Sequence, residues 1–277
     1  MATELTTHRL LDTPVATISD VVCSGQCRHR SPEECAAATH LVFPYRGVYV
    51  RHVGQDDVVA EANQVLFFNV DEGYRISHPI EGGDACVSVS IADVWLRELA
   101  PQRLLQDRAR AMFRPQRLRI DARAQALVAI LRHSLARKLA EPLEGETLAL
   151  TLMRRALGER TSHAGHATAG RRKLVDRAKL VLSSDLARRW TLAQIASEVG
   201  GSPVYLTQVF QQVEGLPLYR YQLRLRLARA LDLLGEYDDL ARLSVDLGFS
   251  SHSHFSASFR QAYGQSPAQF QRALRLR

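Results

Sequence analysis

Apolar and polar residues follow two different periods along this 277-residue chain. Between residues 14 and 91, short runs rich in β-branched and aromatic residues alternate with Gly, Pro, Asn and Asp. Dense short strands of this kind are typical of a compact sandwich or barrel. The runs lie at residues 15–18, 47–50, 58–59, 65–68 and 86–91. We therefore expect a β-rich N-terminal half.

From residue 92 onward the period becomes helical. Residues 122–139 carry apolar residues at helical spacing, and a second amphipathic helix is expected at 146–157. Such helices either cover the strands or pair between subunits. Residues 158–170 are polar, small and Gly-rich, which indicates a linker between domains. After residue 171 the chain reads as helical to its end, with turns at glycines.

The C-terminal segment repeats itself. The run TLAQIASEVG at 191–200 matches DLARLSVDLG at 239–248, and YLTQVFQQVEG at 205–215 matches HFSASFRQAYG at 254–264. Each copy has the layout of a helix-turn-helix.

Local signals mark the ends of these helices. Thr191 and Gln194 have the spacing of a capping box, and Gly200 is expected to end the first helix in a left-handed conformation. Ser202 and Pro203 fit the cap and first position of the second helix. In the second copy, Gly248 ends the first helix, and Ser250 with Ser251 caps the next.

The second helix of each copy is expected to present an outward face of hydroxyl, amide, imidazole and small apolar groups, which can contact base edges and thymine methyls. The candidate DNA-binding residues are Ser202, Pro203, Val204, Tyr205, Thr207, Gln208, Gln211, Ser251, His252, Ser253, His254, Ser256, Ala257 and Arg260. Glu and Lys, which are common on solvated structural helices, are absent from both faces.

A helix at 217–234 joins the two copies, with Arg220, Arg224, Arg226 and Arg229 mostly on its outer side. Its length of about 27 Å is close to one turn of DNA, roughly 34 Å, so both recognition helices could enter adjacent major grooves.

Charge is distributed unevenly between the two halves. Residues 171–277 hold 16 Lys and Arg against 9 Asp and Glu, which accounts for the whole net charge of +7. A basic C-terminal segment favours a polyanionic partner. The preference for Arg over Lys is equally well explained by codon bias in a GC-rich genome.

At this point the sequence resembles the AraC/XylS family of transcription regulators. The resemblance covers residues 174–274 and is carried by AxxxGxSxxxLxxxF from Ala196 to Phe210, RLRLARALDLL at 224–234 and DLGFSSHSHFSASFRQAYGQSP at 246–267. It implies an all-helical DNA-binding domain with two helix-turn-helix motifs, a cupin-like effector-binding or dimerisation domain, and RNA polymerase as a downstream partner. Family members often carry Arg where this chain has Gln208 and Ala257.

We therefore expect an α+β multidomain protein with three parts. Residues 1–157 would form a β-rich, cupin-like barrel with flanking helices, residues 158–172 a linker, and residues 173–277 the all-α DNA-binding domain. The expected function is that of a bacterial, sequence-specific DNA-binding transcription factor, either activator or repressor, that responds to a small-molecule effector. Its expected partners are double-stranded DNA, RNA polymerase and a second copy of the chain. The absence of a signal peptide or apolar span favours the cytoplasm, away from membranes.

Two groups of side chains in the N-terminal half are candidate sites. An effector pocket would be lined by Phe43, Tyr45, Val48, Phe67 and Tyr74, although the same residues could equally form core. Cys23, Cys27 and Cys35, with His29 and His40 nearby, could bind zinc or sense oxidants. The competing interpretation is that these cysteines are reduced, small buried residues.

Signatures of catalysis are missing. The sequence has no P-loop, GxSxG, HExxH or dinucleotide fingerprint, and His40, His52 and His78 do not match the HxH-plus-Glu pattern of metal-binding cupin enzymes. We expect no enzyme activity, cofactor or resident metal. Two rival hypotheses stay open: a metal-dependent cupin enzyme fused to a DNA-binding domain, and a regulator that senses thiol chemistry or metal.

Overall fold

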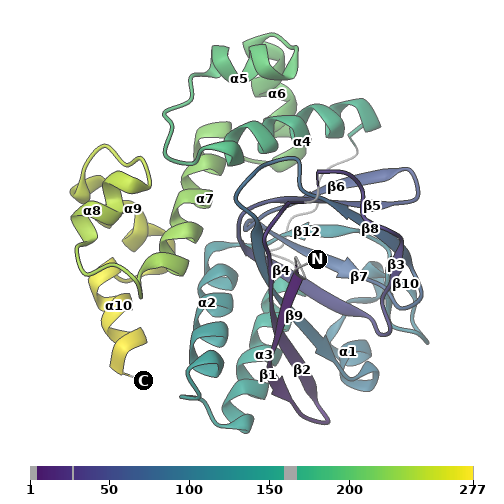
Figure 1. The fold of residues 1–277 in the computed structure, drawn as a ribbon. Coiled ribbons are helices and arrows are strands. Elements are labelled where there is room, and N and C mark those ends of the chain that lie inside the picture. Colours follow the sequence, from purple (N-terminus) through teal and green to yellow (C-terminus); the bar gives the residue numbers. More distant parts are fainter. Residues whose placement is uncertain (1–4, 27, 159–166, 277) are drawn as a thin grey trace. The chain divides into compact units, whose positions relative to one another are not determined.

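The computed structural model describes residues 5–26, 28–158 and 167–276. The chain divides into two compact units, Met1–Thr161 and Ser162–Arg277, and each is considered by itself (Figure 1). Among the described helices, none is long and apolar enough to cross a membrane.

Antiparallel strands build the N-terminal unit. A six-stranded sheet has the order β1 (Leu5–Asp12), β2 (Ala16–Cys23), β9 (Asp84–Ile91), β4 (His40–Arg46), β7 (Gln64–Phe68) and β12 (Arg117–Arg119). A four-stranded sheet has the order β3 (Glu34–Cys35), β8 (Gly73–Ser77), β5 (Tyr49–Val53) and β6 (Asp56–Ala60). A small pair consists of β10 (Leu105–Asp107) and β11 (Met112–Phe113).

Strands form at all of the expected apolar runs, but the expected closed barrel is not confirmed. The larger described sheet ends at edge strands β1 and β12 rather than closing on itself. Strand β1 was not anticipated. Its sequence LTTHRLLD lacks an apolar alternation because most of its side chains are exposed at the sheet edge.

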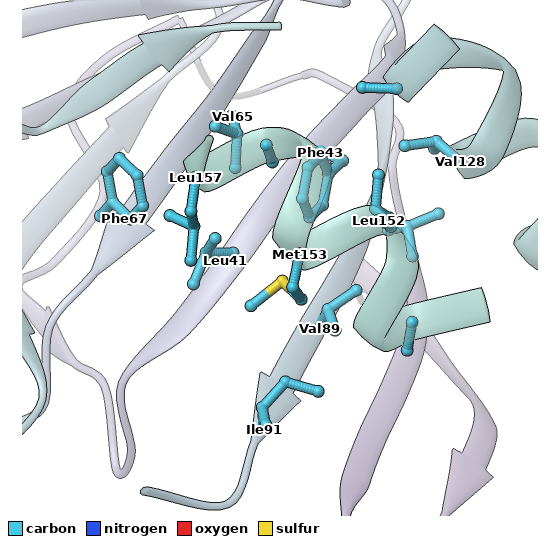
Figure 2. Packing of buried hydrophobic residues seen from close by; sticks show 14 of the residues in the cluster. Leu41, Phe43, Val65, Phe67, Val89, Ile91, Val128, Leu152, Met153 and Leu157 are labelled. Carbon is cyan, nitrogen blue, oxygen red and sulfur yellow. The ribbon is translucent and has the colours of Figure 1, made fainter. Parts of the chain in front are cut away.

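Helices cover one face of the larger sheet. They are α1 (Asp93–Leu99), the short 3-10 helix η1 (Gln102–Leu104), α2 (Ala122–Ala136) and α3 (Pro142–Leu157). Figure 2 shows Leu152, Met153 and Leu157 of α3 against Leu41 and Phe43 of the sheet. Burial of these side chains stabilises the helix–sheet layer.

The opposite face of the larger sheet packs on the smaller sheet. Val42 and Phe68 project there, together with Tyr49 and Val58 from the smaller sheet. Both faces of the central strands are therefore covered, which explains why these strands are nearly continuous apolar runs.

The C-terminal unit is helical in its described part. Its helices are α4 (Ala169–Ser184), α5 (Leu192–Val199), α6 (Pro203–Glu214), α7 (Leu218–Leu233), α8 (Leu240–Asp246), α9 (His252–Tyr263) and α10 (Pro267–Leu276). Figure 1 shows α7 running between the α5–α6 and α8–α9 pairs. Helix α4 begins at Ala169, N-capped by Thr168, so residues 169–172 are helical rather than linker as expected. Residues 159–166 of that segment lie outside the described chain.

Candidate nucleic-acid interface and small-molecule cavity

Helix α5 begins and ends as its sequence predicts. The Gln194 N–H donates to Thr191 Oγ1 at 3.2 Å, and the Thr191 N–H donates to Gln194 Oε1 at 3.0 Å, which completes the capping box. Gly200 ends the helix with a left-handed φ of 71°. This cap turns the chain sharply, so that the next helix starts within a few residues.

Helix α6 starts on Ser202, whose Oγ accepts from the Tyr205 N–H at 3.2 Å, and Pro203 occupies the first turn. Its inner side buries Leu206, Val209 and Phe210. The Phe210 ring meets Tyr221 of α7 edge-on, with 5.1 Å between ring centroids. The first motif is thus anchored to the connecting helix.

A buried ion pair further fixes α6. Lys179 of α4 is fully buried, and its Nζ lies 2.5 Å from Glu214 Oε1 and 3.7 Å from Asp176 Oδ1. A buried charge is tolerated only when it is paired. Glu214, the one carboxylate of α6, therefore points to the buried side of the helix, where it pairs with Lys179 of α4.

The residues expected on the outward face of α6 are exposed to solvent. Its expected contact residues are all exposed, namely Ser202, Pro203, Val204, Tyr205, Thr207, Gln208 and Gln211. Thr207 Oγ1 donates to the Pro203 carbonyl at 2.8 Å, which leaves its lone pairs outward. Gln208 is free of the helix core and carries both a donor and an acceptor.

The second motif repeats this scaffold with differences. Gly248 follows α8 at a φ of 76°, and Ser244 is buried at the crossing. Ser251 alone caps α9, accepting from the His254 N–H at 3.1 Å. Ser250, expected to share this role, instead lies 3.1 Å from His254 Nδ1 through its Oγ.

The outward face of α9 is partly engaged in local contacts. His252, Ser253, His254, Ala257 and Arg260 are exposed, whereas Ser256 is half-buried. Ser256 Oγ lies 3.3 Å from His252 Nε2, and the His254 ring packs on Phe249. Local contacts therefore hold both imidazoles, while Arg260 remains an exposed cation.

Arg226 of α7 was expected on the outer side of the connecting helix, and this expectation is wrong. Its guanidinium donates to the carbonyl oxygens of Leu186 at 2.6 Å, Arg188 at 3.0 Å and Gly248 at 3.0 Å. Burial, and then the nearby Arg189, lower the pKa of Arg226. The residue ties the loop before α5 to the turn after α8.

The N-terminal unit contains a cavity of about 390 Å³ between its two sheets. Apolar lining comes from Val21, Val42, Phe68 and Ile76, among others. Such a volume suits a small organic ligand.

The expected pocket lining needs correction. Tyr74 lines the cavity, but Phe43, Tyr45 and Phe67 belong to the helix-side core, and Val48 is buried without lining the cavity. Alternate residues of a strand point to opposite faces, so Phe43 faces the helices while Val42 faces the cavity.

Of the three predicted cysteines, the two that the structure describes do not lie together at one site. Cys35 is exposed and Cys27 lies outside the described residues, whereas Cys23 lines the cavity beside His78 and Asp84. One ligand atom from each of these three residues lies within 4.8 Å of the others. The Asp84 hydrogen bond, and then Cys23, raise the pKa of His78 to about 10. The sequence had pointed to Cys23 and His78 separately, and it missed Asp84.

Other histidines have structural partners. His52 bridges Asp57 at 2.5 Å and Ser77 at 2.8 Å, and the His40 Nδ1 lies 2.9 Å from the Ala38 carbonyl. His29 is exposed.

Comparison with known proteins identifies the C-terminal unit. A family model described as a helix-turn-helix domain matches residues 195–273. The transcriptional activator RhaR of Klebsiella pneumoniae is 30% identical over 161 residues, 56% of each chain. The regulator GadX of Escherichia coli is 36% identical over 92 residues, 33% of each chain. LumQ of Photobacterium leiognathi is 27% identical over 239 residues, 84% of this chain and 92% of LumQ.

The matched segments thus span about half of RhaR and a third of GadX. The family-model match covers the helices that carry both outward faces, from α5 to α10. By this domain and these relatives, the C-terminal unit is similar to the helix-turn-helix domains of AraC/XylS-type transcriptional regulators.

Proposed function

We propose that this chain is a transcription regulator that binds promoter DNA through α6 and α9 and responds to a small molecule held in its N-terminal unit. The observation that carries the proposal is the pair of exposed helix faces, each built on a capped helix-turn-helix scaffold. The exposed residues of these faces offer hydroxyl, amide, imidazole and methyl groups, and none of the expected contact residues is acidic. Such groups read base edges in the major groove.

The two faces take unequal roles in this proposal. Gln208 can pair with adenine through two hydrogen bonds, whereas Ala257 offers only a methyl contact. Arg260 and the backbone N–H groups at the start of α9 suit phosphate oxygens. Sequence discrimination therefore rests on α6, and α9 mainly anchors the protein to the DNA backbone.

A binding-site selection experiment with Gln208→Ala tests this division. The variant should lose discrimination at one position of the selected site, by about 1–3 kcal/mol, and keep most of its nonspecific affinity. Gln106→Ala, an exposed glutamine of the N-terminal unit, is the matched control and should select the wild-type site. An unaltered consensus for Gln208→Ala would contradict base reading by α6.

The cavity supports the proposed control by an effector. Its apolar lining, with polar groups such as His40, Tyr49 and Ser88, suits a small molecule that is largely apolar and bears a few polar atoms. Genome-wide mapping of binding sites would identify the regulated genes, whose chemistry would narrow the choice of effector.

Resemblance to the AraC/XylS family supports two further partners. RNA polymerase would act downstream at the promoter, and a second copy of the chain would pair through the N-terminal unit. Transcription reconstituted with purified polymerase would test the first, and the mass of the protein in solution would test the second.

A further inference from the structure

Strand pairing brings Cys23 and Asp84 together at one end of the cavity. The two residues are direct partners in the antiparallel β2–β9 register, and both line the cavity. His78 follows the end of β8 and reaches the same place, with its Nε2 donating to Asp84 Oδ2 at 2.6 Å. Three residues far apart in sequence thus converge on one point.

Close backbone packing fixes this arrangement. Gly47 and Gly83 both have left-handed φ values of 68°, and a Cβ on Gly47 would lie 2.0 Å from the Gly83 carbonyl oxygen. A Cβ on Gly83 would in turn lie 2.3 Å from the Cys23 carbonyl oxygen. Only residues without side chains permit these approaches. The cluster is therefore held by neighbouring backbone as well as by its own hydrogen bond.

Besides Asp84, the His78 side chain interacts with Cys23. The side chain is only 6% exposed and Nε2 is held by Asp84, whereas Nδ1 makes no hydrogen bond of regular geometry. A buried nitrogen that is held so weakly costs free energy. In metal sites, a carboxylate often accepts a hydrogen bond from one imidazole nitrogen and so orients the other nitrogen toward the metal.

The donor set points to the chemistry of the ligand. Thiolate, imidazole and carboxylate groups are the usual protein ligands of Zn²⁺. The two negative charges of the thiolate and the carboxylate would also balance the +2 charge of a buried ion. We propose that Cys23, His78 and Asp84 form a site for a divalent transition-metal ion, Zn²⁺ or one of similar softness, at the end of the N-terminal cavity. Cys23 and His78 bind the ion, Asp84 orients His78 or adds a third bond, and the coordination positions that remain face the cavity. The site goes beyond the proposed DNA binding and does not depend on it.

Titration of the full-length protein with Co²⁺ tests the site, because thiolate coordination gives Co²⁺ a charge-transfer absorption band. The wild-type chain should develop this band to stoichiometric saturation. Cys23→Ser should abolish it, and Asp84→Asn should weaken the affinity about 10–100-fold. Cys35→Ser removes an exposed cysteine outside the cluster and should titrate like the wild type. No band in the wild type, or a full band in Cys23→Ser, overturns the proposal.

A second measurement needs no variant. Iodoacetamide labelling of the native protein, read out by peptide mass spectrometry, should modify Cys23 more slowly with Zn²⁺ present and Cys35 at the same rate. Equal labelling of Cys23 with and without Zn²⁺ would also overturn the site. Because DNA is absent from both experiments, their failure would leave the proposed regulator function standing.

Discussion

Gly200 and Gly248 occupy equivalent turns in the two helix-turn-helix motifs but have different surroundings. Both have left-handed φ values, 71° and 76°. A Cβ added to Gly200 meets nothing within 4 Å, whereas one added to Gly248 would lie 2.1 Å from the Ala187 carbonyl oxygen. The same substitution, glycine to alanine, therefore perturbs two equivalent turns to very different degrees.

The surroundings of each glycine determine how much unfolding free energy its substitution by alanine should cost. Gly200→Ala should cost only the strain of a left-handed alanine, about 1 kcal/mol of unfolding free energy. Gly248→Ala adds a collision that must push the loop at Ala187 away from Gly248. That movement weakens hydrogen bonds from Arg226, which link Gly248 to Leu186 and Arg188. Losing one such charged bond adds about 1.5–3 kcal/mol, which gives a total of about 2.5–4 kcal/mol.

Trp190 is a natural probe for this experiment, since the loop before α5 contains it and its Nε1 donates to the Asp185 carbonyl at 3.1 Å. The other tryptophan, Trp95, lies in the N-terminal unit and is exposed, so Trp95→Phe provides a background that reports the C-terminal unit alone. Urea unfolding followed by Trp190 fluorescence gives the two free energies. Equal costs for Gly248→Ala and Gly200→Ala would refute the reasoning. In an Arg226→Met background the cost of Gly248→Ala should shrink, because the bonds that the collision strains are already gone.

A buried ion pair and the charge of the DNA-facing surface can be tested in the same C-terminal unit. Lys179→Met should destabilise it by about 3–5 kcal/mol because the buried Glu214 carboxylate loses its lysine partner. Lys179→Met combined with Glu214→Met should restore much of the loss in the same urea assay, and fully additive costs would show that the pair is not coupled. With about 6 phosphate contacts, DNA affinity measured by fluorescence anisotropy should fall about 10³-fold between 50 and 200 mM salt, and a change below about tenfold would rule out such a phosphate footprint.

The sequence predicts the helix-turn-helix motifs well because their signals are local. Thr191 with Gln194, Gly200, and Ser202 with Pro203 each act within one turn of chain, so no distant contact can override them. Arg226 shows the opposite case. Its pattern on α7 indicates a solvated arginine, but its partners lie 22 to 40 residues away and become visible only once the helices are packed.

The N-terminal unit was harder to predict for a related reason. The central strands are covered on both faces, so their apolar runs do not say which side chains face the helices and which face the cavity. Phe43 and Val42 are equally apolar, yet they lie on opposite sides of the sheet. The meeting of Cys23, His78 and Asp84 depends on strand register and on glycine contacts, and no spacing in the sequence encodes either.

The position of Arg226 has a consequence for the operators that this protein could use. The Arg226 guanidinium hydrogen-bonds both the loop before α5 and the turn after α8. These bonds restrict how far the two helix-turn-helix motifs can move relative to each other. Inserting one base pair between two half-sites rotates one of them by about 35° around the DNA axis. Two motifs joined by a flexible linker could follow this rotation, whereas two motifs held together by Arg226 could not. Operators should therefore vary in the bases opposite α9 far more readily than in the separation between their halves.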